Sequence, residues 1–440
     1  MPANSPPGRS YVLHSPCIQT GCPLLEPTPP SADLLEPRKP LFTGYQDPVF
    51  PRDRYWLHLL LFALTLASTI VAGGQLVGRF LIYPNAVPED PITWLRDRQF
   101  ILDGLRFGAS LLLFLTIHEF GHYIAARIHG INTSLPYYIP TFIFGLGTLG
   151  AVIRIREPIP ATRTLFDIGV AGPLAGFVAA LGVLLYAFAT LPSPAYIMDL
   201  PGHEALKAYI EQHGVFPESS MTLMAPPEEG AMTIIVGQTP LYWLLSRFFE
   251  NVPPMDEMYH YPMLFAGWMG LFFTALNLLP VGQLDGGHIL YTLIGPKWHS
   301  RIARSFVILL LISGAIGFVD EGFPWLASVH PYLGRLAWFI LAAVLYYYLA
   351  RIFLGNHRFI APSLLGIIAV VVLVRSLADD PASYGYTGWL IWCLLIVTLI
   401  RVDHPPVLRP ERLTPMRRVL ALLSILIFLL CFSFTPLRVL

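Results

Sequence analysis

The run His118-Glu119-Phe120-Gly121-His122 holds the residue types needed to bind a metal ion and to use it for hydrolysis. Residues four apart share one face of a helix, so both imidazoles can bind a single ion. A Zn²⁺ ion with three protein ligands keeps a fourth position for water and lowers the pKa of that water to about 7. We therefore predict that His118 and His122 are metal ligands, with Glu119 as general base and then general acid.

A third metal ligand is expected from a second polar run, Asn-Leu-Leu-Pro-Val-Gly-Gln-Leu-Asp-Gly-Gly-His at 277–288. Its carboxylate, Asp285, follows an apolar segment that is expected to end near the depth of His122. Pro280 and the glycines beside Asp285 would unwind the helix and let the carboxylate turn inward. We predict Asp285 as the third ligand. A solvated helix cap is the ordinary alternative for such an aspartate.

Asn277 and His288 flank this carboxylate. Asn277 lies one to two helical turns earlier, where its amide could orient a ligand or assist the oxyanion, so it is a candidate catalytic residue. Packing between helices is the alternative. His288 could orient Asp285 through a hydrogen bond, or could make only a local one.

Composition places these residues in a membrane protein. Of 440 residues, 55% are hydrophobic and 13% are charged, against about 25% charged in a soluble domain. The mean hydropathy is +0.59. A soluble protein of this length could not bury so much apolar surface, so lipid must be the solvent for much of the chain. The net charge is zero, which gives no indication of a nucleic-acid partner.

The elements that position the polar residues are apolar segments long enough to cross a bilayer of about 30 Å. We predict an all-α polytopic membrane protein with about nine transmembrane helices. The expected spans are Tyr55–Ile82, Ile101–His129, Leu165–Leu191, Tyr261–Pro280, Ala303–Val319, Val329–Ile352, Phe359–Leu377, Gly388–Val402 and Val419–Phe434.

Two segments between the spans have a different pattern. Leu135–Ile155 is apolar but is interrupted by proline and glycine, and it is rich in strand-forming residues. A small membrane-associated β-hairpin is expected there, after the helix with the two histidines. Within the acidic loop 192–260, the segment Ile234–Phe249 is expected to form an amphipathic helix at the membrane interface.

Basic residues gather in alternate loops, which predicts the orientation. The loops after the second, fourth, sixth and eighth spans are basic, with Arg127, Arg154, Arg156, Arg163, Lys297, Arg301, Arg304, Arg351, Arg358, Arg409, Arg412, Arg417 and Arg418. The N-terminus and the candidate site are therefore expected on the cytoplasmic side. A bacterial plasma membrane is expected because no transit peptide is apparent.

The chain is expected to divide into three parts. Residues 1–54 are rich in proline and form a disordered tail. Residues 55–300 form a catalytic membrane core of four spans that includes the acidic loop, and residues 301–440 supply further transmembrane helices. The oligomeric state is left open.

At these motifs the chain resembles the site-2 protease family of intramembrane zinc metalloproteases, in its bacterial and plastid-type branch. The resemblance rests on the HEFGH run, the NLLPVGQLDGGH run and the AGPLAG run at Ala171–Gly176, and extends weakly to His404–Pro406. Small residues four apart, such as Gly172 and Gly176, favour close packing of helices, with shaping of the substrate path as a secondary role.

The resemblance implies a zinc metalloendopeptidase that cuts in or near the transmembrane helix of a membrane-protein substrate. It implies one Zn²⁺ held by His118, His122 and Asp285, with Glu119 catalytic, and a hairpin at Leu135–Ile155 that holds the substrate extended. A helix hides its peptide bonds, so a substrate must unwind before water can attack it.

Three alternatives remain. An ion-coupled transporter could relay protons through the same polar residues, but the paired half-repeats typical of transporters are not seen in the sequence. An inactive protease-like scaffold would keep the fold, although the intact residues argue against it. A zinc protease of the lineage with a downstream glutamate ligand fits less well than Asp285 does.

Overall fold

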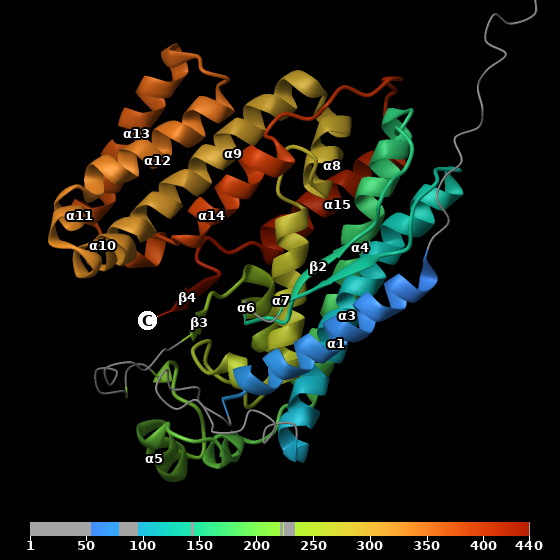
Figure 1. Cartoon of the computed structure of the whole chain (residues 1–440). Coiled ribbons are helices and arrows are strands. Elements are labelled where there is room, and N and C mark those ends of the chain that lie inside the picture. Colours follow the sequence, from blue (N-terminus) through green and yellow to red (C-terminus); the bar gives the residue numbers. More distant parts are fainter. Residues whose placement is uncertain (1–53, 79–95, 142–144, 221–222, 224–233, 440) are drawn as a thin grey trace, which may run out of the picture. The chain divides into compact units, whose positions relative to one another are not determined.

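The computed structural model describes residues 54–78, 96–141, 145–220, 223 and 234–439 (Figure 1). It is mostly helical, at 70%, which confirms a helical membrane protein as the fold class. The predicted N-terminal tail, 1–54, lies almost wholly outside the described residues. Within the described part, six helical segments are long and apolar enough to cross a membrane: Tyr55–Leu76, Arg98–Ile128, Thr162–Ala189, Pro296–Val329, His357–Leu377 and Pro381–Ile400.

Every expected span overlaps a helix. The helices concerned are α1 (Tyr55–Leu76), α3 (Arg98–Ile128), α4 (Thr162–Ala189), α7 (Pro262–Asn277), α9 (Pro296–Gly317), α12 (Ala337–Ile352), α13 (His357–Leu377), α14 (Gly388–Leu395) and α15 (Pro415–Cys431). Helices α7 and α12 have 16 residues each and α15 has 17, at or below the lower limit of about 17 residues for a spanning helix. The count of nine is therefore not confirmed.

Helices α1, α3, α4 and α7 lie side by side (Figure 1). Helix α3 carries His118, Glu119 and His122 of the candidate site. Glycines permit the close crossings. A β-carbon at Gly104 of α3 would lie 2.1 Å from the Ile70 carbonyl oxygen of α1. Helix α3 begins after Asp97, whose carboxylate accepts a hydrogen bond from the Gln99 backbone N–H at 2.7 Å, a common N-cap arrangement.

The predicted hairpin is present. Strands β1 (Tyr137–Pro140) and β2 (Thr148–Val152) pair antiparallel after α3. The Ser68 hydroxyl of α1 donates to the Gly147 carbonyl at 2.6 Å, and the hydroxyls of Thr116 and Tyr138 are 2.7 Å apart. The hairpin is therefore fixed to both α1 and α3.

The acidic loop differs from the sequence expectation. Its described elements are η2 (Pro194–Asp199), α5 (Glu204–His213), β3 (Ile234–Val236), α6 (Pro240–Ser246) and η4 (Met258–His260). The prediction of one helix over Ile234–Phe249 is wrong at its start. The β-branched residues of β3 pair with β4 (Leu437–Val439), and the helix begins only at Pro240, where the Thr239 hydroxyl caps it.

The C-terminal part returns to the core. Helix α9 continues through η5 (Phe318–Gly322) into α10 (Phe323–Val329), and α11 (Pro331–Arg335) follows. The 3-10 turn η6 (Pro381–Tyr384) precedes α14, and the π-helical turn η7 (Ile396–Ile400) extends it. Helix α15 then packs against α4, α7 and α8 (Asp285–Ile294).

Candidate active site

The two histidines of α3 point toward each other in a buried position. His118 is 3% exposed and His122 is 7% exposed. Their Nε2 atoms are 3.1 Å apart, as expected for residues four apart on one helical face. His122 donates its Nδ1–H to the Ile168 carbonyl of α4 at 2.7 Å. This bond fixes the tautomer that leaves the Nε2 lone pair available for a metal ion.

Asp285 reaches the histidines from the first turn of α8. Helix α7 ends at Asn277, and the chain turns through Gly282, whose φ is +53°. A β-carbon at Gly286 would lie 2.0 Å from the Leu278 carbonyl oxygen, so only glycine lets α8 start this close to the end of α7. The Asp285 Oδ2 atom lies 3.2 Å from His122 Nε2 and 3.5 Å from His118 Nε2.

These three atoms fit a tetrahedral zinc ion. Ligands about 2.0–2.1 Å from a tetrahedral ion are about 3.3 Å apart, and the three separations are 3.1, 3.2 and 3.5 Å. Two imidazole nitrogens and a carboxylate oxygen are also a common donor set for zinc. The structure thus brings the predicted ligands together, and their role in metal binding stays a prediction.

Glu119 and Asn277 both lie beside this cluster. The Glu119 carboxylate is 7% exposed and accepts a hydrogen bond from the backbone N–H of Ile153, just beyond β2. The Asn277 Nδ2 atom is 3.4 Å from His118 Nε2. All five residues that the sequence predicts for the site are therefore neighbours.

The glycines of the AGPLAG run meet the histidine rings directly. A β-carbon at Gly172 would lie 2.1 Å from His122 Nε2, and one at Gly176 would lie 2.9 Å from His118 Nδ1. The close helix packing expected for this run is present. Sequence reasoning did not foresee that the surface packed against these glycines consists of the candidate ligands.

The sequence profile of peptidase family M50 matches residues 106–318. This segment contains both polar runs and the glycines between them. This segment is similar to peptidase family M50. The predicted resemblance to the site-2 proteases is confirmed.

Curated proteins that are similar to this chain carry names of zinc proteases. One from Oryza sativa subsp. japonica, "Probable zinc metalloprotease EGY1, chloroplastic", is 32% identical over 55% of this chain and 38% of its own length. Two from Arabidopsis thaliana, named EGY2 and EGY1, are 25% and 29% identical over 58% of this chain and 40% and 43% of their own lengths. The chain spans about two fifths of the length of these relatives. No solved structure matches.

The names of these relatives bear on the predicted location. All three are described as chloroplastic, which does not support the expected bacterial plasma membrane. Membrane association agrees with the six apolar helices. The predicted orientation stays a prediction.

A histidine pair lies near the Asp285 carboxylate. His288 Nδ1 is 2.7 Å from His404 Nε2. His404 Nδ1 donates to the Pro405 carbonyl, so His288 is the donor in the pair. The ring of Tyr291 stacks on His404 at 4.1 Å. Burial lowers the pKa of His288 to about 4 and also lowers that of His404. The local hydrogen bond expected for His288 is thus made to His404.

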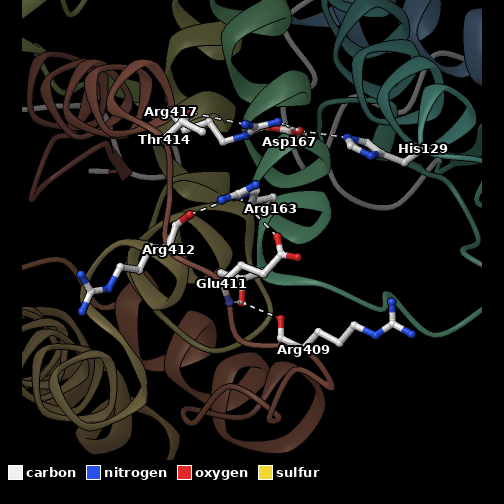
Figure 2. Close-up of polar contacts among 9 residues, drawn as sticks. His129, Arg163, Asp167, Arg409, Glu411, Arg412, Thr414 and Arg417 are labelled. Atoms are coloured by element: carbon white, nitrogen blue, oxygen red, sulfur yellow. Dashed lines mark hydrogen bonds and ion pairs between the residues drawn. The ribbon is translucent and has the colours of Figure 1, made fainter.

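A polar network fixes the start of α4 near the candidate active site (Figure 2). The Arg417 guanidinium of α15 donates to both oxygens of Asp167, at 2.8 and 2.7 Å. The His129 ring, just after α3, is 2.9 Å from the same carboxylate. The residue after Asp167 is Ile168, whose carbonyl orients His122. The network therefore joins the end of α3, the start of α4 and the start of α15 at Asp167, next to the residue that orients a candidate ligand.

Proposed function

We propose that this protein is an intramembrane zinc metalloendopeptidase that hydrolyses peptide bonds in or near the transmembrane segments of membrane proteins. The observation that carries the proposal is the convergence of His118, His122 and Asp285. Their ligand atoms are separated as tetrahedral zinc requires. They belong to the long apolar helix α3 and to the first turn of α8. Polar side chains in such a place rarely occur without a partner or a task.

His118, His122 and Asp285 would hold the ion. Zinc bound there would supply a Lewis acid that lowers the pKa of water and polarises a carbonyl. Glu119 would take the proton of the attacking water and deliver it to the leaving nitrogen. The Ile153 N–H fixes one side of the Glu119 carboxylate, so the base keeps its orientation. Asn277 would donate a hydrogen bond from its amide to the developing oxyanion.

The hairpin offers a means of holding an unwound substrate. Among the described residues β2 pairs only with β1, so its second edge can add a further strand. The side chains of Leu149 and Val152 are 60% and 51% exposed. The strand is followed at once by Ile153, which contacts Glu119. A substrate segment extended along this edge would carry its peptide bonds past the base.

We further propose nine membrane crossings, with the short helices α7, α12 and α15 reaching the boundary through their flanking residues. The candidate active site then lies near the basic side of the membrane, which is the side predicted to be cytoplasmic. Four arginines gather around the start of α4 (Figure 2), namely Arg163, Arg409, Arg412 and Arg417. Residues 55–300 would form the catalytic core and 301–440 the further spans.

The test is metal analysis and cleavage with the purified full chain in lipid vesicles. A tagged single-span model protein would serve as substrate for the wild type, Glu119→Gln and Glu250→Gln, an exposed control in the acidic loop. We expect Glu119→Gln to keep its zinc and to lose activity by a factor of about 10² or more. The control should cleave normally.

Each contrary outcome has a clear meaning. Equal cleavage by wild type and Glu119→Gln would remove Glu119 from the mechanism. A wild-type chain that binds zinc but cleaves no spanning substrate would favour the inactive scaffold. A chain without zinc would favour the transporter.

A further inference from the structure

A second group of metal-ligating side chains lies at the other end of α7 from Asp285. It consists of His203, at the N-terminus of α5, with Glu257 and His260 around the turn η4. The turn is a 3-10 helix, in which residues three apart are eclipsed, so Glu257 and His260 share one side. His203 then approaches from a loop that lies 54 residues earlier.

The hydrogen bonds of the two rings determine which nitrogens carry protons in the neutral tautomers. His260 donates its Nδ1–H to the Val77 carbonyl at 2.7 Å, and His203 donates its Nδ1–H to the Pro201 carbonyl at 3.0 Å. Both Nε2 atoms therefore keep their lone pairs. They face each other at 3.0 Å. Two acceptors at this distance repel unless a cation lies between them.

A buried carboxylate completes the group. The Oε2 atom of Glu257 lies 3.3 Å from His203 Nε2 and 3.4 Å from His260 Nε2. Both Glu257 and His260 are 1% exposed. The other oxygen, Oε1, lies 2.7 Å from the Ser220 hydroxyl, which orients the carboxylate. Oε2 has no hydrogen-bond partner among the described residues.

The geometry matches that of the candidate active site. The three separations are 3.0, 3.3 and 3.4 Å here, against 3.1, 3.2 and 3.5 Å there. His203 also holds a left-handed backbone conformation, with φ at +65°. Such a conformation is costly for a residue with a side chain and often marks a functional position. Here it brings the imidazole to the cluster.

We propose that His203, Glu257 and His260 form a second zinc site. Two imidazoles with one carboxylate favour zinc over the harder ions calcium and magnesium. The ion would join the loop before α5 and the turn before α7. It would also join the end of α1, since the Val77 carbonyl holds His260. Helix α7, which lies between the two clusters in the chain, has 16 residues, so it is about 24 Å long at about 1.5 Å per residue.

The competing explanation is a proton shared among the same three side chains with no metal. Zinc content distinguishes the two, since only a metal site changes the number of ions per chain. The zinc content per chain would be measured by mass spectrometry on the full chain, purified from cells grown with zinc. The proteins compared are the wild type, Glu257→Gln, Asp285→Ala, the double variant and His213→Gln. His213 is an exposed histidine on α5 that contacts only the Tyr209 carbonyl among the hydrogen bonds of the described residues.

Two zinc ions are expected in the wild type and in His213→Gln, one in each single variant, and none in the double variant. X-ray absorption of Asp285→Ala should show two imidazoles and only nitrogen or oxygen ligands around the remaining ion. A single ion in the wild type that disappears in Asp285→Ala would overturn the proposal. This result does not depend on whether Glu257→Gln folds. If instead the candidate active site binds no zinc, Asp285→Ala would keep the wild-type zinc content, so the two failures can be told apart.

Discussion

Gly172 leaves the space that the ring of His122 occupies, because a β-carbon at Gly172 would lie 2.1 Å from the Nε2 atom. That nitrogen is one of the three candidate ligand atoms. Close packing of α4 against α3 and the position of the candidate ligand His122 therefore depend on the same glycine. Gly121 of α3 faces α4 in the same way. A β-carbon at Gly121 would lie 2.6 Å from the Ala171 carbonyl oxygen.

Gly172→Ala should displace the His122 ring and lower the zinc occupancy and cleavage together. Gly182→Ala is the matched control, since a β-carbon at that position of α4 meets nothing within 4 Å. The control should be neutral or slightly stabilising, because alanine is favoured over glycine in helices by about 1 kcal/mol. Zinc analysis and cleavage assays compare the two variants. Full zinc content in Gly172→Ala would mean that the ring does not need this space.

Asn277→Ala should lower kcat while leaving zinc bound. Loss of one oxyanion donor commonly costs a factor of about 10²–10³ in kcat. Gln283→Ala serves as the control, since it removes an exposed amide from the same polar run. Steady-state kinetics and zinc analysis separate the roles. If Asn277→Ala keeps its kcat, the residue serves only for packing.

Arg417→Ala should destabilise the fold near the site. The guanidinium donates two hydrogen bonds to Asp167 and is 27% exposed, so a loss of about 1–2 kcal/mol in unfolding free energy is expected. Arg418→Ala removes an exposed neighbour and should change little. Thermal unfolding in detergent would measure both. Equal melting temperatures would show that the pair adds no net stability.

The sequence could predict the parts of the site that depend on local spacing. The four-residue spacing of His118 and His122 in the sequence places both on one helical face. The glycines around Asp285 indicate a turn. The lengths of α7 and α12 were harder to predict, because apolar residues continue into the flanking turns. A hydropathy pattern does not show where helical hydrogen bonding stops.

Contacts between distant segments could not be predicted. The Ile168 carbonyl that orients His122 carries no side-chain signal. The partner of His288 is His404, 116 residues away, and β3 pairs with a strand at the C-terminus. Only the Glu-x-x-His spacing of Glu257 and His260 offered a sign of the second cluster, and it does not identify His203.

The most direct test of the central claim is zinc content and cleavage in chains whose second cluster is removed by Glu257→Gln. In that background we predict one zinc ion per chain and cleavage of a spanning substrate. Adding Asp285→Ala should abolish both the zinc and the cleavage. If the doubly substituted chain still holds one zinc ion and cleaves, His118, His122 and Asp285 do not form the catalytic metal site.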